Sequence, residues 1–264
     1  AALPDQPAAG PAKATAVAEP SGRPPRTTAP WRQLRWFVPL ALVSVAFVAF
    51  SLPPYLTFDP SQSRLPGTRD GFPLYYPLLV THIFFGSVAL LAGCLQVWPW
   101  LRRHHPAVHR MSGRVYVFGG VLPAGVAVLG VAPLSSTGFV SQVGNTFLAL
   151  LWLPITIAGY RMARQRRFAE HREWMIRSFA LTTSIVVNRL WVILLVVVLS
   201  PQVGTTFGGA QDAMITAAAN AGVWLSWVVN LLVAEWWLQR GRARAQRQPA
   251  LPGAGSPRGA SSGS

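Results

Sequence analysis

The sequence has few acidic residues: 8 aspartates and glutamates stand against 23 lysines and arginines, and only 12% of its 264 residues are charged. Soluble domains normally contain about 25% charged residues. Such a low charged fraction, combined with 51% hydrophobic residues, is typical of an integral membrane protein. The single cysteine, Cys94, excludes a disulfide framework within the chain and is expected to be a buried packing thiol.

The sequence also lacks the motifs of several enzyme classes. It contains no P-loop, no dinucleotide-binding fingerprint, no HExxH zinc motif and no GxSxG nucleophile elbow. Acids are so scarce that no Ser-His-Asp triad can be assigned. Hydrolysis by these common arrangements and nucleotide-dependent chemistry are therefore not indicated.

Six apolar runs are long enough to cross a hydrocarbon core of about 30 Å. They cover residues 36–56, 76–101, 112–131, 143–162, 175–199 and 219–238. Helices are expected, because a membrane span must satisfy its own backbone polar groups. The predicted fold is an all-α, polytopic membrane helical bundle of six transmembrane helices. Spans 2–5 are expected to form a four-helix core, with spans 1 and 6 flanking it.

The predicted organisation has three parts. Residues 1–32 are rich in Ala, Pro, Gly and Thr and are expected to be a disordered cytoplasmic tail. Residues 33–240 form the six-span domain, and residues 241–264 form a second disordered cytoplasmic tail. We interpret the first run as an anchor, with signal cleavage near Ser51 as a minor alternative.

The distribution of basic residues predicts the orientation in the membrane. If the N-terminus is cytoplasmic, the outer loops hold only Arg64 and Arg69 of the 23 basic residues, and Arg189 lies within a span. This asymmetry predicts that both termini lie in the cytoplasm. Arginines in short loops beside span ends are explained by orientation and anionic lipid, so no nucleic-acid partner is expected.

The fifth run contains Asn188 and Arg189 near its middle. An arginine near the bilayer centre costs about 3 kcal/mol on insertion scales, so it is expected to face a partner or water. Ser178, Thr182 and Arg189 recur at helical spacings on one stripe with Ile185, which predicts an inward polar face. Either backbone carbonyls, Asn188 and water satisfy Arg189, or it lines a cavity for a quinone, a haem propionate or a lipid headgroup.

His82 is the second polar group expected inside a span. It lies on one stripe with Gly86, Ala89 and Gly93 in the second run. Small residues at these spacings let helices approach closely, and they also make room for a flat ligand. Because intramembrane histidines are often functional, His82 is a candidate ligand, with Arg189 as its expected neighbour in the outer half.

Two short basic loops lead into the third and fifth spans and carry a third set of candidates. The residues are His109, Arg110, Arg114, His171, Arg172 and Arg177. The ends of these two loops are expected to lie near one another, where two imidazoles and nearby arginines suit a haem edge, a metal ion or an anionic headgroup. Glu170 and Glu173 flank His171, so a structural salt-bridge network is the alternative.

Several of these residues resemble the pattern of a known family. His82-x-x-x-Gly86, HR-x-x-GR at 109–114, H-x-x-W-x-x-R at 171–177 and NR at 188–189 are similar to bacterial predicted membrane proteins grouped as domain of unknown function 2306. The resemblance covers residues 76–200 and implies a multi-pass plasma-membrane protein without an assigned activity.

A weaker similarity is to four-helix membrane cytochromes of b type, in which histidines on facing helices bind haem. This similarity makes His82, His109 and His171 candidate haem ligands. The sequence departs from the pattern because His82 has no second His or Met in the outer half of a span. His109 and His171 could pair, but they are expected at the inner interface rather than within the bundle. The pattern of a haem held by two histidines is therefore not met, and a single-His haem or a quinone site is the alternative left open.

Three functional hypotheses follow. The first is a membrane redox or redox-accessory protein that binds haem b or a quinone. The second is a small-molecule transporter or lipid-binding protein that holds a hydrophobic or anionic ligand. The third is a structural or assembly subunit without catalysis, associated with a membrane-protein partner or with copies of itself. The lipid bilayer is a partner in all three, and whether the chain is an enzyme is left open.

Overall fold

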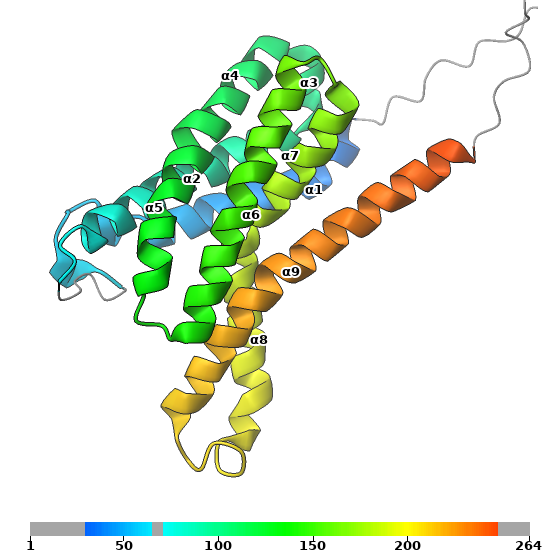
Figure 1. Ribbon diagram of the computed structural model, residues 1–264. Coiled ribbons are helices and arrows are strands. Elements are labelled where there is room, and N and C mark those ends of the chain that lie inside the picture. The colour runs from blue at the N-terminus through cyan, green and yellow to red at the C-terminus, as the bar shows by residue number, and fades with distance from the viewer. Residues whose placement is uncertain (1–29, 65–70, 248–264) are drawn as a thin grey trace, which may run out of the picture.

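The computed structural model describes residues 30–64 and 71–247, and all regular elements in these ranges are helical. The α-helices are α1 (Pro30–Ser51), α2 (Tyr75–Val97), α3 (Pro99–His104), α4 (Pro106–Tyr116), α5 (Leu122–Val131), α6 (Phe139–Arg164), α7 (Phe168–Thr182), α8 (Ser184–Leu199) and α9 (Gln211–Gln246) (Figure 1). A π-helical segment, Val117–Val121, joins α4 to α5. Single 3-10 turns lie at Pro53–Tyr55, Pro60–Gln62, Ala132–Leu134 and Ser200–Gln202.

Among the described residues, six helical stretches are long and apolar enough to cross a membrane. They are Leu34–Tyr55, Tyr75–Val97, Pro106–Leu134, Phe139–Arg164, Ser184–Gln202 and Gln211–Arg244. The predicted all-α polytopic bundle with six spans is confirmed. The third span passes through the π-helical segment without a break.

A close backbone contact joins α2 to the π-helical segment between α4 and α5. A Cβ atom at Gly120 would lie only 2.8 Å from Ala89 Cα, so the two backbones approach as closely as they do because residue 120 has no side chain. Ala89, Tyr116 and Trp152 belong to one buried cluster, which unites α2, α4 and α6. Close approach at small residues is the usual way for membrane helices to gain van der Waals contact.

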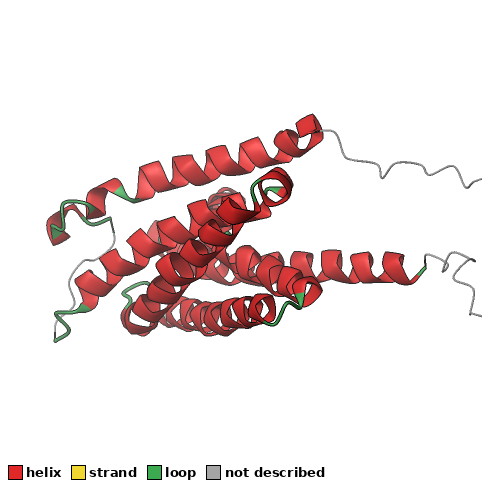
Figure 2. Cartoon of the chain, turned by 90° about the horizontal axis from the view of Figure 1, so that it is seen from above, coloured by secondary structure: helices red, strands yellow, loops and turns green. Residues whose placement is uncertain are grey.

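The inner arrangement differs in one respect from the predicted four-helix core. The last span is not merely a flanking helix, because α9 contributes Trp227 to the buried core cluster and packs against α6, α7 and α8. Span 1 does flank the bundle: α1 contacts α2 and α3 and lies at the margin in Figure 2. The Cys94 thiol donates to Ser44 Oγ on α1 at 3.2 Å and is buried, as expected for a packing thiol.

The fifth predicted span is two helices rather than one. Thr183 separates α7 from α8, and its hydroxyl bonds back to the carbonyls of Phe179 and Ala180, both at 3.1 Å. The Ser184 hydroxyl bonds back to Leu181 O in the same way. Such back-bonding by Ser and Thr bends helices. Beyond this break, α8 and the start of α9 form a hairpin that projects past α5 and α6 (Figure 1).

The two predicted tails lie largely outside the described residues. Residues 1–29 and 248–264 are not described, so their predicted disorder stays a prediction. At the C-terminal side, α9 continues to Gln246, past the predicted start of the tail at residue 241. Arg242, close to the end of α9, bonds to Glu173, so this helix remains in contact with α7 in its last turns.

Candidate functional site

Basic side chains from α3, α4 and α7 converge at one end of the bundle, which we call the basic end. His109 on α4 lies within electrostatic range of Arg102 on α3 and of His171 on α7. Partial burial and the nearby charges of Arg172 and Arg103 lower the pKa of Arg102. The ends of the two basic loops therefore meet, as the sequence predicts, and their positive charges repel one another.

The two histidines of the basic end differ in their hydrogen bonds. His171 Nδ1 donates to Gly159 O on α6 at 2.8 Å, since a carbonyl can only accept. This bond leaves Nε2 of a neutral His171 as the acceptor. His109 Nδ1 is buried and has no hydrogen-bond partner within residues 30–64 and 71–247. An imidazole nitrogen in that state is a group to which a ligand can add a hydrogen bond.

The glutamates near the basic end each form an ion pair with an arginine. Glu173 accepts two hydrogen bonds from Arg242 on α9, and these bonds lower the pKa of its carboxyl group. Arg177 donates in the same two-pronged way to Glu235 on α9, with a distance of 3.2 Å from Nη2 to Oε2. Glu170 is held by Arg167, three residues earlier.

The predicted salt-bridge network is therefore present around His171, and it fastens α7 to α9. Arg177, a predicted ligand-binding residue, is part of this network. Neither Arg102 nor Arg172 forms an ion pair with a carboxylate of the described residues, although Arg172 lies within electrostatic range of Glu173. Arg110 and Arg114, the other predicted residues of α4, are exposed.

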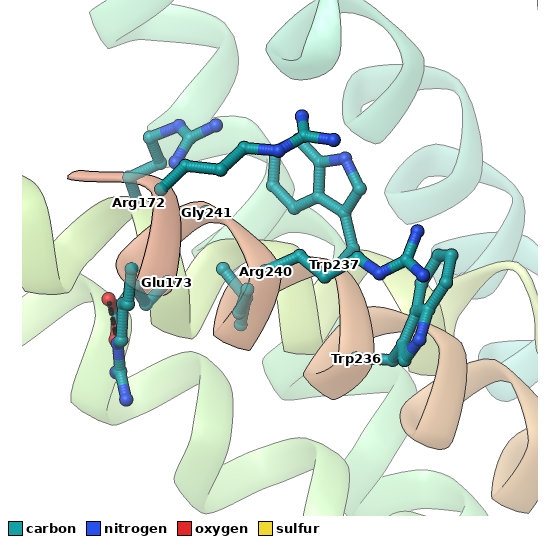
Figure 3. A pocket seen from close by; sticks show the side chains of 9 residues that line it. Arg172, Glu173, Trp236, Trp237, Arg240 and Gly241 are labelled. Atoms are coloured by element: carbon teal, nitrogen blue, oxygen red, sulfur yellow. Dashed lines mark hydrogen bonds and ion pairs between the residues drawn. The ribbon is translucent and has the colours of Figure 1, made fainter. Parts of the chain in front are cut away.

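A groove of about 400 Å³ opens between the start of α7 and the basic part of α9. Arg172 lies over the Trp237 ring at 4.9 Å, and Arg240 lies over the Trp236 ring at 3.8 Å. Figure 3 shows these cations and indoles along the groove, with Glu173 at its side. The lining combines positive charge with apolar surface, which is the combination that an anionic group attached to an apolar chain requires.

His82 lies far along α2 from this cluster and has a different partner. Its Nδ1 donates to Ala124 O on α5 at 3.0 Å. Along the predicted small-residue stripe, Gly93 packs closely against Phe179 and Tyr116, whereas a Cβ at Gly86 would meet no atom within 4 Å. The stripe thus serves close packing at Gly93 and leaves open space at Gly86.

The predicted inward stripe of the fifth span is wrong at Arg189. Ser178 and Thr182 on α7 are buried, but Ile185 and Arg189 on α8 are exposed, because the break at Thr183 ends the stripe. Asn188 is the residue that turns inward, against Gly222 of α9.

Arg189 is also not the neighbour of His82. The helix that carries Arg189 packs on α9 and meets α7 only at their junction, whereas His82 is bonded to α5. No hydrogen bond or ion pair joins Arg189 to another described residue.

A buried polar network that sequence reasoning missed lies in the centre of the bundle. Tyr116 Oη is 2.6 Å from Ser178 Oγ and 2.7 Å from Thr182 Oγ1. Trp152 Nε1 donates to Thr182 Oγ1 at 3.0 Å, and Thr156 Oγ1 is 2.6 Å from Ser178 Oγ. The spacing of Ser178 and Thr182 was a signal for this site, but their partners come from α4 and α6. Each hydroxyl has a protein partner, so the network fastens three helices.

The sequence matches the family described as Predicted membrane protein (DUF2306) over residues 79–238, which is more than half of the chain. The chain belongs to this family. The match begins just before His82 and includes most of α9, so it extends past the predicted limit of residue 200 to the helix that completes the core. No curated protein and no solved structure matches the chain. The weaker similarity to b-type cytochromes gains no support from these comparisons.

Proposed function

We propose that this membrane protein binds an anionic amphiphile at its basic end, as a lipid-binding or small-molecule transport protein. The observation that carries the proposal is the pair Arg102 and Arg172, which lie near each other while neither forms an ion pair with a described carboxylate. Neighbouring like charges destabilise a fold unless a counter-charge is supplied. Arg167, Arg177 and Arg242 near this end, in contrast, each form an ion pair with a glutamate.

The surroundings of the two arginines suit the head of an amphiphile. His109 and His171 stand beside them, and Arg172 also lines the groove with Trp236 and Trp237. Indole rings favour the depth at which lipid headgroups lie. Phosphate or carboxylate oxygens would accept hydrogen bonds from the guanidinium groups, while the apolar body would lie along the helices in the bilayer.

The same charge distribution supports a cytoplasmic basic end. Under the positive-inside rule, α3, the start of α4 and the α6–α7 connection face the cytoplasm of a bacterial inner membrane, together with both termini. The groove would then meet the inner leaflet, which carries anionic lipid.

Thermal unfolding in nanodiscs tests the headgroup proposal. We expect the wild type to gain stability when phosphatidylglycerol replaces part of the phosphatidylcholine, and the double variant Arg102→Gln/Arg172→Gln to lose most of that gain. Arg164→Gln removes an exposed cation at the end of α6 and is the matched control. Equal gains in the double variant and the wild type would contradict the proposal.

Adding inorganic phosphate to detergent-solubilised protein distinguishes the two sources of the anion. If phosphate raises the unfolding midpoint of the wild type, the site accepts a free anionic solute. If only phosphatidylglycerol raises the midpoint, the anion must be part of a lipid.

A second candidate, a haem b or quinone redox role, is favoured by one observation. His82 and His171 each donate Nδ1–H to a backbone carbonyl, which is how metal-bound histidines are commonly oriented. Nε2 of either residue would then be available to hold the iron of a haem, and Arg172, next to His171 in the sequence, would bind an acidic group of the same cofactor. The described residues contain no group of three or more metal-ligating side chains, so a metal held by the protein alone is not favoured.

Absorption spectra of the oxidised and reduced protein, purified after haem-replete expression, test this role. A Soret band that is lost in His171→Ala would establish haem at the basic end. No Soret band and no quinone in a solvent extract would leave the redox role without support. If lipid binding failed as well, the third hypothesis, an assembly subunit, would be the remaining one.

A further inference from the structure

Arg189 lies in a membrane span, away from the basic end, and forms no ion pair with a described residue. It is exposed on an apolar face of α8 that also carries Ile185, Leu190 and Ile193, all exposed. This helix belongs to the span Ser184–Gln202. An apolar exposed face in a membrane span normally meets lipid, and a guanidinium is costly there.

The depth of Arg189 makes an interfacial position difficult. Along α7 and α8 it lies roughly 18 Å beyond Arg177 and roughly 20 Å short of Gln202, at 1.5 Å per residue. The hydrocarbon core is about 30 Å thick, so a residue midway between these points is near its centre. Lipid phosphates lie at the surfaces of the bilayer, too far away to be the standing partner of this cation.

A second copy of the chain does not supply the missing charge. Within the six spans found among the described residues, the acids are Asp212 and Glu235. Glu235 is bound by Arg177. Asp212 lies in the first turn of α9, roughly 15 Å along that helix from Gly222, the residue that packs beside Asn188.

We propose that the α8 face around Arg189 docks a transmembrane helix of another protein that carries an aspartate or glutamate at mid-depth. Ile185, Leu190 and Ile193 would pack against the apolar side of that helix, and the carboxylate would accept hydrogen bonds from the guanidinium. Polar pairs between membrane helices fix partner and register, since the alternative for each group is an unsatisfied position in hydrocarbon. The proposal is independent of the anion site at the basic end.

Energy transfer in phosphatidylcholine liposomes tests this pairing. The full-length protein carries a donor fluorophore fused to its C-terminus, and synthetic polyleucine transmembrane peptides carry an acceptor. One peptide has Asp at its central position, and two controls have Asn or Leu there. We expect the Asp peptide to associate with the wild type about tenfold more strongly than the Leu peptide does, as for a polar helix–helix contact of 1–2 kcal/mol.

Variants assign the effect to Arg189. Arg189→Leu is expected to abolish the preference for the Asp peptide, and Arg189→Lys to retain most of it. Arg164→Leu, which removes an exposed arginine from the end of α6, is expected to leave it unchanged. A variant is included in the comparison only if its thermal unfolding midpoint equals that of the wild type. An Asp peptide that binds equally well to Arg189→Leu would overturn the proposal.

Two further arms separate the other occupants of this face. Donor- and acceptor-labelled copies of the protein, mixed without peptide, report self-association; if it depends on Arg189, a second copy is the occupant and the proposal is overturned. The proposal is also overturned if phosphatidylglycerol displaces the Asp peptide from the wild type and from Arg164→Leu alike, because lipid would then occupy the face around Arg189. Peptide binding that persists in phosphatidylglycerol and depends on Arg189 supports the proposal.

Discussion

The packing of α2 against the π-helical segment yields a sharp prediction, because two adjacent glycines have different surroundings. A Cβ at Gly120 would lie 2.8 Å from Ala89 Cα and 3.0 Å from Ala89 N, and these backbone atoms cannot move without moving α2. A Cβ at Gly119 would meet its nearest atom, Val115 Cγ1, at an ordinary 3.7 Å. We expect Gly120→Ala to lower the free energy of unfolding by about 1–3 kcal/mol relative to Gly119→Ala, the cost of overpacking.

The comparison between the two variants isolates the packing cost. Replacing Gly by Ala changes the conformational freedom of the backbone at either position, and that contribution cancels in the difference. The buried Cys94 supplies the assay, since it is the single thiol in the chain and only 4% exposed. A thiol-reactive dye in mild detergent reports its exposure during heating. Tryptophan fluorescence is recorded in parallel, because release of α1 alone would also expose Cys94.

The expected result is a lower midpoint for Gly120→Ala in both signals, with Gly119→Ala at or above the wild type. Equal midpoints for the two variants would refute the reasoning, because they would mean that Ala89 and residue 120 are not in close contact. A lower midpoint in the dye signal alone would assign the effect to the attachment of α1.

Three further predictions concern polar contacts. Tyr116→Phe removes a hydroxyl bonded to two buried hydroxyls, so it is expected to cost about 1–3 kcal/mol in chemical unfolding, while Tyr160→Phe costs less. Arg177→Met is expected to lower the unfolding midpoint more than Arg242→Met, because the Arg177 side chain is 16% exposed and that of Arg242 is 56% exposed. Hydrogen bonds from Arg242 lower the pKa of Glu173, so its contribution to stability is present at neutral pH and lost as acidification protonates it. Glu173→Gln should therefore flatten the acidic side of the stability profile; an unchanged profile would contradict this assignment.

The membrane spans could be predicted from the sequence, but the break between α7 and α8 at Thr183 could not. Residues 175–199 form a predominantly apolar run, and periodicity alone extends one helix through it. The break at Thr183 follows from hydroxyls that bond back to carbonyls of the preceding turn. Because it ends the stripe of Ser178 and Thr182, a spacing that was informative on α7 predicted the wrong face for Arg189 on α8.

The spacing of polar residues along the sequence also did not predict which residues they pair with. Glu235 is 58 residues from Arg177 and pairs with it because α7 and α9 lie side by side. The Tyr116 hydroxyl reaches Thr182 across 66 residues for the same kind of reason. The position of His109 and His171 at the same end was predictable, since both follow basic loops on one side of the membrane.

Composition and hydrophobic length by themselves determined the class of this protein, because a hydrocarbon core accepts apolar helices of a particular length and few other structures. The arrangement of basic loops likewise determined which helix ends meet. Only the tertiary structure decided which cations are neutralised, since an ion pair depends on the distance between helices that are remote in sequence. It pairs Arg177 and Arg242 with glutamates, leaves Arg102 and Arg172 near each other, and places Arg189 on an exposed apolar face.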